Sequence, residues 1–196
     1  MPIPSKQEFT LSRDGGVFFL TLISEDGMNR LTRRKVIALT DEIRNLASQH
    51  APILPIVISG EHNFSAGADL HEIAALTAPE AYAFSVMGQA LMHSIATFPA
   101  PVIAAVEGHC MGGGLDLALA CHRRIAAPNA VFGHRGAALG LITGWGGTQR
   151  LPRIVGKGVA LELFIAAEKV TAHRALEIGL VDAIADDPVA EALRRI

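Results

Sequence analysis

The amino-acid sequence predicts an α/β fold, in which strands and helices alternate along one chain. Short apolar runs at 54–59 and 102–106 are rich in β-branched or small residues, as buried strands are. Segments between and after them carry apolar residues at three- and four-residue steps, the spacing of amphipathic helices. Gly and Pro separate these segments, which indicates short connections.

The first half of the chain begins with a predicted hairpin. Asp14-Gly15-Gly16 is a turn signal between two strand-like runs. Thr32 is a candidate helix cap, because apolar residues with helical spacing follow it. The expected elements are strands at 9–13, 17–23 and 54–59, a helix after Thr32, a short helix near Asp69, and a longer helix that opens at Pro79 and ends before Pro99.

The second half is expected to return to the sheet and then to close with helices. Gly179 is a candidate C-terminal cap. The expected elements are a strand at 102–106, a turn at 108–114, a helix at 115–121, a strand at 124–127, a Gly-rich loop at 133–147, and helices at 159–167 and 172–178. No repeat or linker divides the chain, so we expect a single domain over residues 1–196.

Composition excludes several classes of function. Half of the 196 residues are apolar, and the net charge is −2 without a basic block. This argues against nucleic acid or an anionic membrane as a partner. Cys110 and Cys121 lie in apolar sequence, so we expect reduced, buried thiols rather than a disulfide. Residues 1–14 lack the apolar core of a secretion signal, which makes a cytoplasmic location the default expectation.

Two glycine-bearing loops follow the two buried strands, at 64–70 and 108–116. Ligands of α/β sheets bind beyond the carboxyl ends of strands. Small residues let backbone N–H groups approach a ligand, and a helix N-terminus adds free donors. Two such loops could aim two N–H groups at one oxygen, as an oxyanion hole requires. Alternatively, these glycines only permit tight turns. The chain lacks GxGxxG and GxxxxGK[ST], so neither a dinucleotide nor a P-loop nucleotide is favoured.

Five segments of the chain together resemble the enoyl-CoA hydratase/isomerase (crotonase) family. They occur in uninterrupted order over about residues 9–185. The segments are SAGADL at 65–70, PVIAAVEG at 101–108, GGGLDLALAC at 112–121, GGTQRLPR at 146–153 and ALEIGLVD at 175–182. The resemblance implies a crotonase-like spiral of ββα units.

The resemblance also implies a catalytic site. The oxyanion-hole donors would be the backbone N–H groups of Ala68 and Gly113, in the two loops described above. Asp116 stands where hydratases of the family carry their first catalytic glutamate. It lies three residues after Gly113, so on a helix the two residues share a face. Otherwise, Asp116 would be only a carboxylate favoured near a helix N-terminus.

Substrate contacts follow from the same resemblance. Ala66, Asp69 and Leu70 would line the path of the pantetheine and adenine of coenzyme A. Arg30 is a candidate phosphate contact, or else a solvated surface arginine. Trp145 lies where the family closes its acyl pocket, and it would narrow that pocket or only pack the loop.

The sequence departs from the hydratase pattern at Gly136, where the second catalytic glutamate is expected. Glycine transfers no proton, which puts ordinary two-acid hydration in doubt. Some members of the family, naphthoate synthases among them, also have glycine there. His134 is a possible acid/base and Arg135 could bind an acyl carboxylate, although either could be an ordinary loop residue.

The expected function is that of an enoyl-CoA hydratase/isomerase-like enzyme acting on an acyl-CoA thioester. The alternatives are a single-acid reaction, such as double-bond isomerisation or decarboxylation, and a CoA-thioester-binding subunit without turnover. We expect no metal and no cofactor, because coenzyme A is part of the substrate. The family also implies a homotrimer or hexamer, and its members usually carry further C-terminal helices, so we expect this helical part to be largely missing here.

Overall fold

The computed structural model describes residues 8–49 and 52–196 and contains a six-stranded sheet in the order β1-β2-β3-β4-β6-β9. β1 is antiparallel to β2, and all the other neighbours are parallel. The predicted α/β class is therefore confirmed. The strands are β1 (Phe9–Asp14), β2 (Val17–Leu22), β3 (Ile56–Gly60), β4 (Val102–Val106), β6 (Arg123–Ala126) and β9 (Ala183–Ile184).

The predicted hairpin is present. Asp14 pairs with Val17, which leaves Gly15 and Gly16 as a two-residue turn. Both glycines have positive φ angles, as turns that match the twist of a hairpin require. The expectation about a secretion signal concerns the first residues of the chain, and residues 1–7 lie outside the described part.

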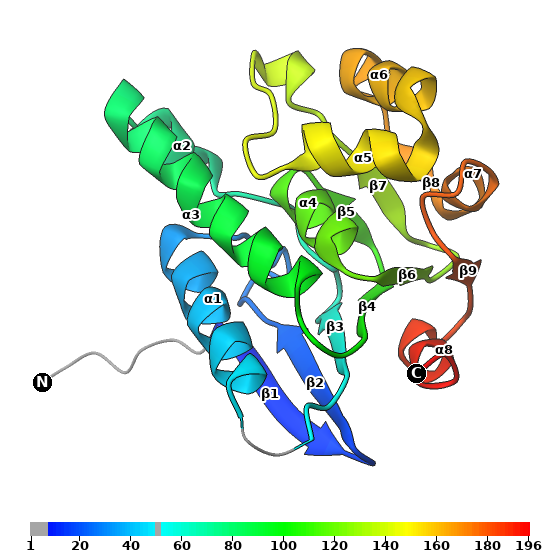
Figure 1. The fold of residues 1–196 in the computed structure, drawn as a ribbon. Coiled ribbons are helices and arrows are strands. Elements are labelled where there is room, and N and C mark those ends of the chain that lie inside the picture. Colours follow the sequence, from blue (N-terminus) through cyan, green and yellow to red (C-terminus); the bar gives the residue numbers. More distant parts are fainter. Residues whose placement is uncertain (1–7, 50–51) are drawn as a thin grey trace, which may run out of the picture.

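Helices cover the sheet on both faces (Figure 1). α1 (Arg33–Ala47) and α3 (Ala78–Ala96) lie side by side, with α4 (Gly113–Ala120) beside α3. On the other face, α8 (Pro188–Leu193) packs through Ala192 against strand residues of a separate apolar cluster. The predicted cap is confirmed, because the Thr32 hydroxyl accepts a hydrogen bond from the Lys35 N–H.

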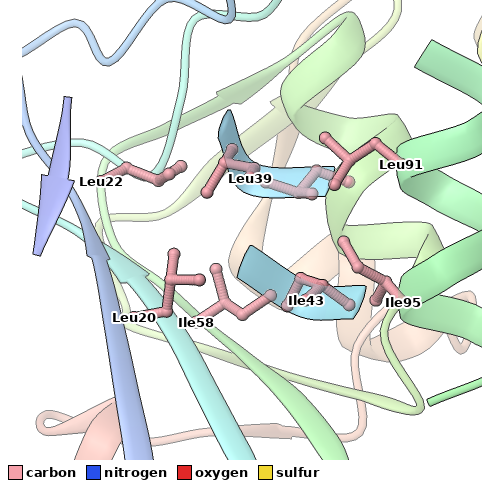
Figure 2. A pocket seen from close by; sticks show the side chains of 8 residues that line it. Leu20, Leu22, Leu39, Ile43, Ile58, Leu91 and Ile95 are labelled. Atoms are coloured by element: carbon pink, nitrogen blue, oxygen red, sulfur yellow. The ribbon is translucent and has the colours of Figure 1, made fainter. Parts of the chain in front are cut away.

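The main core is built between β2, β3, α1 and α3. Figure 2 shows leucine and isoleucine side chains from these elements pointing toward one another. The space between them leaves no room for a water molecule. This tight packing fixes the strands whose carboxyl ends carry the candidate site. The side chains are those of Leu20, Leu22, Leu39, Ile43, Ile58, Leu91 and Ile95.

The second half of the chain contains a second, three-stranded sheet, which the sequence did not predict. It consists of β5 (His109–Met111), β7 (Val131–Gly133) and β8 (Val170–Thr171). These strands have two or three residues each, too few for an alternating pattern to stand out in the sequence. The strand β5 lies within the predicted turn, and helix α4 then begins at Gly113 rather than at residue 115.

Helix α5 (Gly147–Val155) was not predicted, because it starts at a Gly-Gly pair and contains Pro152. The other helices are α2 (Leu70–Ala74), α6 (Lys157–Ala166) and α7 (Ala172–Glu177), and a short 3₁₀ helix spans Ala137–Leu139. Gly179 ends α7 as predicted: its N–H and that of Leu180 return to carbonyls of the last turn.

Both cysteines are free and buried, which confirms the expected thiols. Burial raises the pKa of Cys121 to about 12, so this thiol stays protonated at neutral pH. Over the described residues, no helix has the length and apolar character needed to cross a bilayer.

Candidate active site

The two glycine-bearing loops form one wall of a cavity of about 590 Å³. Helices α2 and α3 and the 134–145 segment provide the other walls. In Figure 1 this segment is the yellow-green loop above α4. The lining residues used below are Ala66, Ala68, Leu70, Phe84, His109, Met111, Gly113, Asp116, His134, Arg135, Gly136, Thr143, Trp145 and Lys169.

The first loop is held from two sides. On one side, the Leu31 N–H donates to the Gly67 carbonyl at 2.8 Å. The Ser65 hydroxyl donates to the Asn29 carbonyl at 2.8 Å. On the other side, the Ser65 N–H donates to the His109 carbonyl and the Met111 N–H donates back to Ser65. The loop is thus tied both to the 28–31 segment and to β5.

The two loops touch at glycines. A Cβ built on Gly67 would lie 2.5 Å from the Met111 carbonyl oxygen and 2.9 Å from the Gly113 nitrogen. Gly67 also has φ +93°, a conformation that side chains rarely adopt. The absence of a side chain at Gly67 therefore lets the two loops approach each other.

Two unpartnered backbone donors lie at this contact. Over residues 8–49 and 52–196, the N–H groups of Ala68 and Gly113 make no hydrogen bond to the protein. Gly113 is the first residue of α4, whose first N–H groups have no acceptor within the helix. A Cβ on Gly113 would be 3.2 Å from the Ala68 nitrogen. Both donors are therefore close together on the cavity wall.

Asp116 lies one turn after Gly113 on α4, and both residues line the cavity. The Asp116 side chain is 2% exposed. Its Oδ2 accepts a short hydrogen bond from the Thr143 hydroxyl. Its Oδ1 is 3.3 Å from Nε2 of His134, whose side chain is 5% exposed. These contacts fix a buried carboxylate in the cavity wall, beside the two free N–H groups.

Helix α5 begins against this carboxylate. A Cβ built on Gly147, the first residue of α5, would be 2.2 Å from Asp116 Oδ1. Further along α5, burial lowers the pKa of the Arg150 guanidinium, whereas the Asp116 charge raises it. A cation and a helix N-terminus, which carries partial positive charge, thus both lie near the Asp116 carboxylate.

Trp145 is part of the cavity wall. It is buried, its Nε1–H donates to the Phe84 carbonyl at 3.2 Å, and the two ring centroids are 5.2 Å apart. A Cβ on Gly88 of α3 would lie 2.1 Å from the indole, and one on Gly113 would lie 2.6 Å from it. The indole is thus wedged between α3 and the start of α4.

A comparison with known proteins identifies the family of this chain. The family model "Enoyl-CoA hydratase/isomerase" matches residues 12–195. This chain belongs to the enoyl-CoA hydratase/isomerase family. The "Crotonyl-CoA hydratase" of Syntrophomonas wolfei is 38% identical over 179 residues, which are 91% of this chain and 69% of that protein.

Solved structures agree with this family and confirm the crotonase-like fold. The enoyl-CoA hydratase of Bacillus anthracis superposes with a TM-score of 0.90 at 32% identity, over 96% of this chain and 75% of that one. DspI of Pseudomonas aeruginosa superposes with a TM-score of 0.91 at 33% identity, over 99% of this chain and 75% of that one. This chain therefore spans about three quarters of these two structures.

Four residues were expected from the family to contact coenzyme A; two of them line the cavity and two do not. Ala66 and Leu70 line the cavity. Asp69 caps α2 by accepting from the His71 and Glu72 N–H groups, and it is not among the lining residues. Arg30 is exposed and paired with Asp26, also outside the lining.

The charged groups of the cavity are unevenly distributed. Among the described residues that line it, Asp116 is the only carboxylate, while Arg135 and Lys169 are cationic. Gly136, the position at which the resemblance led us to expect a second glutamate, lies in the wall. No group of three or more His, Cys, Asp or Glu within the described ranges could hold a metal ion.

Several residues of the site were not identified from the sequence. Thr143 and Gly147 hold the Asp116 carboxylate in place, and Lys169 lines the cavity next to the start of β8. The only signal for Thr143 is a polar residue between the apolar Leu141-Ile142 and Gly144, which is too weak to indicate a role. Lys169 enters the site only through the unpredicted second sheet.

Proposed function

We propose that this chain is an enzyme of the hydratase/lyase type that acts on an acyl-CoA thioester. The N–H groups of Ala68 and Gly113 bind the thioester oxygen, and Asp116 transfers a proton. The observation that carries the proposal is the pair of unpartnered N–H groups at one point of the cavity wall, next to a buried carboxylate.

This arrangement suits enolate chemistry. When a nucleophile adds to the β-carbon of an enoyl thioester, negative charge develops on the thioester oxygen. Preorganised N–H donors stabilise that charge, and losing one donor typically costs about 3 kcal/mol of barrier. The Asp116 carboxylate, one helical turn away, can accept the proton of an attacking water.

A single-acid reaction is the second candidate, because Asp116 is the only carboxylate among the described lining residues. Isomerisation of a double bond moves one proton from the α- or γ-carbon to the other carbon, so one carboxylate is enough in principle. Decarboxylation needs an enolate site and a single proton donor. Both reactions use the same two N–H groups.

The substrate requires no separate cofactor in this proposal, because coenzyme A enters as part of the thioester. Ala66 and Leu70 lie in the cavity wall, where they can contact its pantetheine. Trp145 limits the acyl end. Arg30 is paired with Asp26 through one guanidinium nitrogen, and its release from Asp26 for a CoA phosphate can be tested.

Two measurements on the purified protein test the function. Loss of the enoyl-thioester absorbance of crotonyl-CoA measures hydration, and a calorimetric titration with butyryl-CoA measures binding without turnover. Hydration supports the first candidate. Conversion of a 3-enoyl-CoA without hydration of crotonyl-CoA supports the single-acid alternative. Tight binding with neither reaction would show a CoA-thioester-binding subunit instead.

We also infer a homo-oligomer, with a trimer or hexamer as the expected state. Large apolar side chains are exposed at the end of the 3₁₀ helix, just after it and on α6, and a partner copy would cover them. They are Leu139, Leu141, Ile142, Leu161 and Ile165. Light scattering that shows a stable monomer over a wide concentration range would exclude this assembly.

A further inference from the structure

His134 and Asp116 present two polar atoms that face each other in the cavity wall. His134 Nε2 and Asp116 Oδ1 are 3.3 Å apart, and both side chains are at least 95% buried. Across the described ranges, neither atom has a hydrogen-bond partner. The two atoms are thus within ion-pair distance, but their geometry does not join them in a hydrogen bond. Both are buried polar atoms without a partner in the wall of the cavity.

The surroundings hold this geometry in place. The Thr143 hydroxyl donates to the other oxygen of Asp116, so the carboxylate cannot easily turn. The His134 ring packs against the Phe164 ring, with centroids 5.3 Å apart. A Cβ on Gly147 would lie 2.2 Å from Oδ1 and 2.9 Å from Nε2. The backbone of α5 therefore covers one side of the pair, and both residues belong to the cavity wall.

We propose that His134 is the second proton-transfer group of this active site, in the role that a carboxylate at position 136 would otherwise have. Gly136 lies two residues after His134 in the same wall and has no group that could transfer a proton. The inference rests on the proposed function, because it assigns one step of the reaction on an enoyl thioester.

The step begins with Asp116 as carboxylate and His134 as imidazolium. The water oxygen bonds to the β-carbon, and its proton goes to Asp116 Oδ1. The π electrons of the double bond move toward the thioester, whose oxygen becomes the enolate held by Ala68 and Gly113. The enolate then collapses. Its α-carbon takes the proton of His134 Nε2, and the carbonyl re-forms.

The pair then restores itself. After the addition, Asp116 is a carboxylic acid and His134 is a neutral imidazole. A proton then passes from Oδ1 to Nε2. The two atoms are 3.3 Å apart without a hydrogen bond, so this transfer requires a small rotation of one side chain or a bridging water molecule, and it returns both groups to their starting states. One water has been added across the double bond, and no other reactant is consumed.

The charges around the pair come from three parts of the chain. Arg150 of α5 interacts with Asp116. Arg135 follows His134 in the chain, Lys169 precedes β8, and both line the cavity. Two imidazoles line the cavity, those of His109 and His134, and His134 is the one that faces Asp116. Its removal should therefore change the pH dependence of turnover in a way that loss of a distant histidine should not.

The test compares His134→Gln with His173→Gln, whose imidazole is exposed on α7. In the first variant, kcat on crotonyl-CoA should fall by roughly 10²- to 10⁴-fold, with KM nearly unchanged. The change in kcat over the pH range in which an imidazole gains or loses its proton should disappear. His173→Gln should match the unmodified protein in both measurements.

Chemical rescue separates proton transfer from a structural role. His134→Ala leaves a space in the cavity wall, and added imidazole should restore part of kcat in proportion to its concentration. If His134→Ala does not fold, the pH profile of His134→Gln tests the role of His134 instead. Binding of butyryl-CoA by His134→Gln then serves as the check that its site is intact.

Two outcomes would overturn the role of His134: unchanged turnover of His134→Gln while Asp116→Asn is impaired, or a lower kcat with the same pH profile and no rescue by imidazole. A protein that binds butyryl-CoA but turns over no enoyl-CoA at all, even unmodified, would instead overturn the proposed function.

Discussion

Gly147, at the first position of α5, lies against the carboxylate of Asp116 on α4, with room for a hydrogen atom but not for a methyl group. A Cβ at Gly147 would be 2.2 Å from Asp116 Oδ1 and 2.8 Å from the methyl carbon of Thr143. The N-terminal end of a helix carries partial positive charge. This contact therefore brings a favourable dipole end to a buried anion and, at the same time, fixes the position of that anion.

Replacing Gly147 with alanine should disturb both stability and turnover. The added methyl group must displace Asp116 or the start of α5, and overpacking of this kind costs about 1–3 kcal/mol of unfolding free energy. Displacement of Asp116 should also lower kcat more than it raises KM. Chemical denaturation and turnover of crotonyl-CoA measure the two effects.

Gly158→Ala is the matched control. Gly158 is exposed near the start of α6, and a Cβ there meets nothing within 4 Å. This substitution should leave turnover unchanged and stabilise the protein by up to about 1 kcal/mol, because alanine favours the helix. Equal stability and activity of the two variants would show that Asp116 is not held as described.

Trp145 should determine which acyl chains the site accepts. Trp145→Ala should cost about 3–5 kcal/mol of stability, because it empties a buried, well-packed volume. It should also shift the ratio of kcat/KM values toward longer acyl chains, since the indole occupies part of the cavity wall, where it packs against Phe84. Tyr82→Ala, on the exposed face of helix α3, should change stability by no more than about 0.5 kcal/mol.

Arg30 and Asp26 provide a titration test of phosphate binding. A hydrogen bond from the Arg30 guanidinium is the main cause that lowers the pKa of Asp26 to about 2, and the Met28 N–H and the Ser24 hydroxyl add to it. If Arg30 leaves Asp26 for a CoA phosphate, the carboxylate loses this partner and its pKa should rise. The same rise is expected in Arg30→Gln without ligand.

The pKa of Asp26 can be followed by NMR of its side-chain carbon as the pH is lowered. Because the folded-state pKa is depressed, the Arg30–Asp26 interaction favours the folded state above the ordinary aspartate pKa. This contribution is lost as the pH falls through about 2. An unchanged Asp26 titration with saturating coenzyme A would mean that Arg30 does not leave Asp26 for its phosphates.

Much of the fold could be predicted because it depends on local signals. The hairpin at Gly15-Gly16, the cap at Thr32 and the end of α7 at Gly179 each need only a few neighbouring residues. The apolar strands β3 and β4 were visible because buried parallel strands are continuous apolar runs. The second sheet was missed, because its strands are stabilised by partners far away in the chain, as in the pairing of β5 with β7.

The site was predictable only in part, for a related reason. Gly113 and Asp116 share one helix, so their spacing alone indicates a common face. Their relation to Ala68 required the resemblance to a family, because the two loops meet through Gly67 although they lie far apart in the sequence. The contacts of Asp116 with Thr143 and His134 come from a segment without regular spacing, and no local pattern shows which way those side chains point.

The carboxylate of Asp116 is the group whose removal tests the chemistry most directly. Asp116→Asn keeps the size of the side chain and can still accept the Thr143 hydrogen bond, but it cannot take a proton. We expect kcat to fall by roughly 10²- to 10⁴-fold while butyryl-CoA binding stays nearly constant. Asp41→Asn, which alters an exposed carboxylate on α1, should change neither quantity.

Adding the missing carboxylate at Gly136 is not a clean reverse test. A Cβ at Gly136 would lie 2.6 Å from the Leu141 carbonyl oxygen, and the Leu141 N–H donates back to the Gly136 carbonyl. Gly136→Glu must therefore distort the 136–142 turn, and failure to raise activity would say little about proton transfer. Asp116→Asn avoids this strain. Full turnover by the folded Asp116→Asn protein would move the acid/base role away from α4, whereas strong loss with intact binding would assign it to this carboxylate.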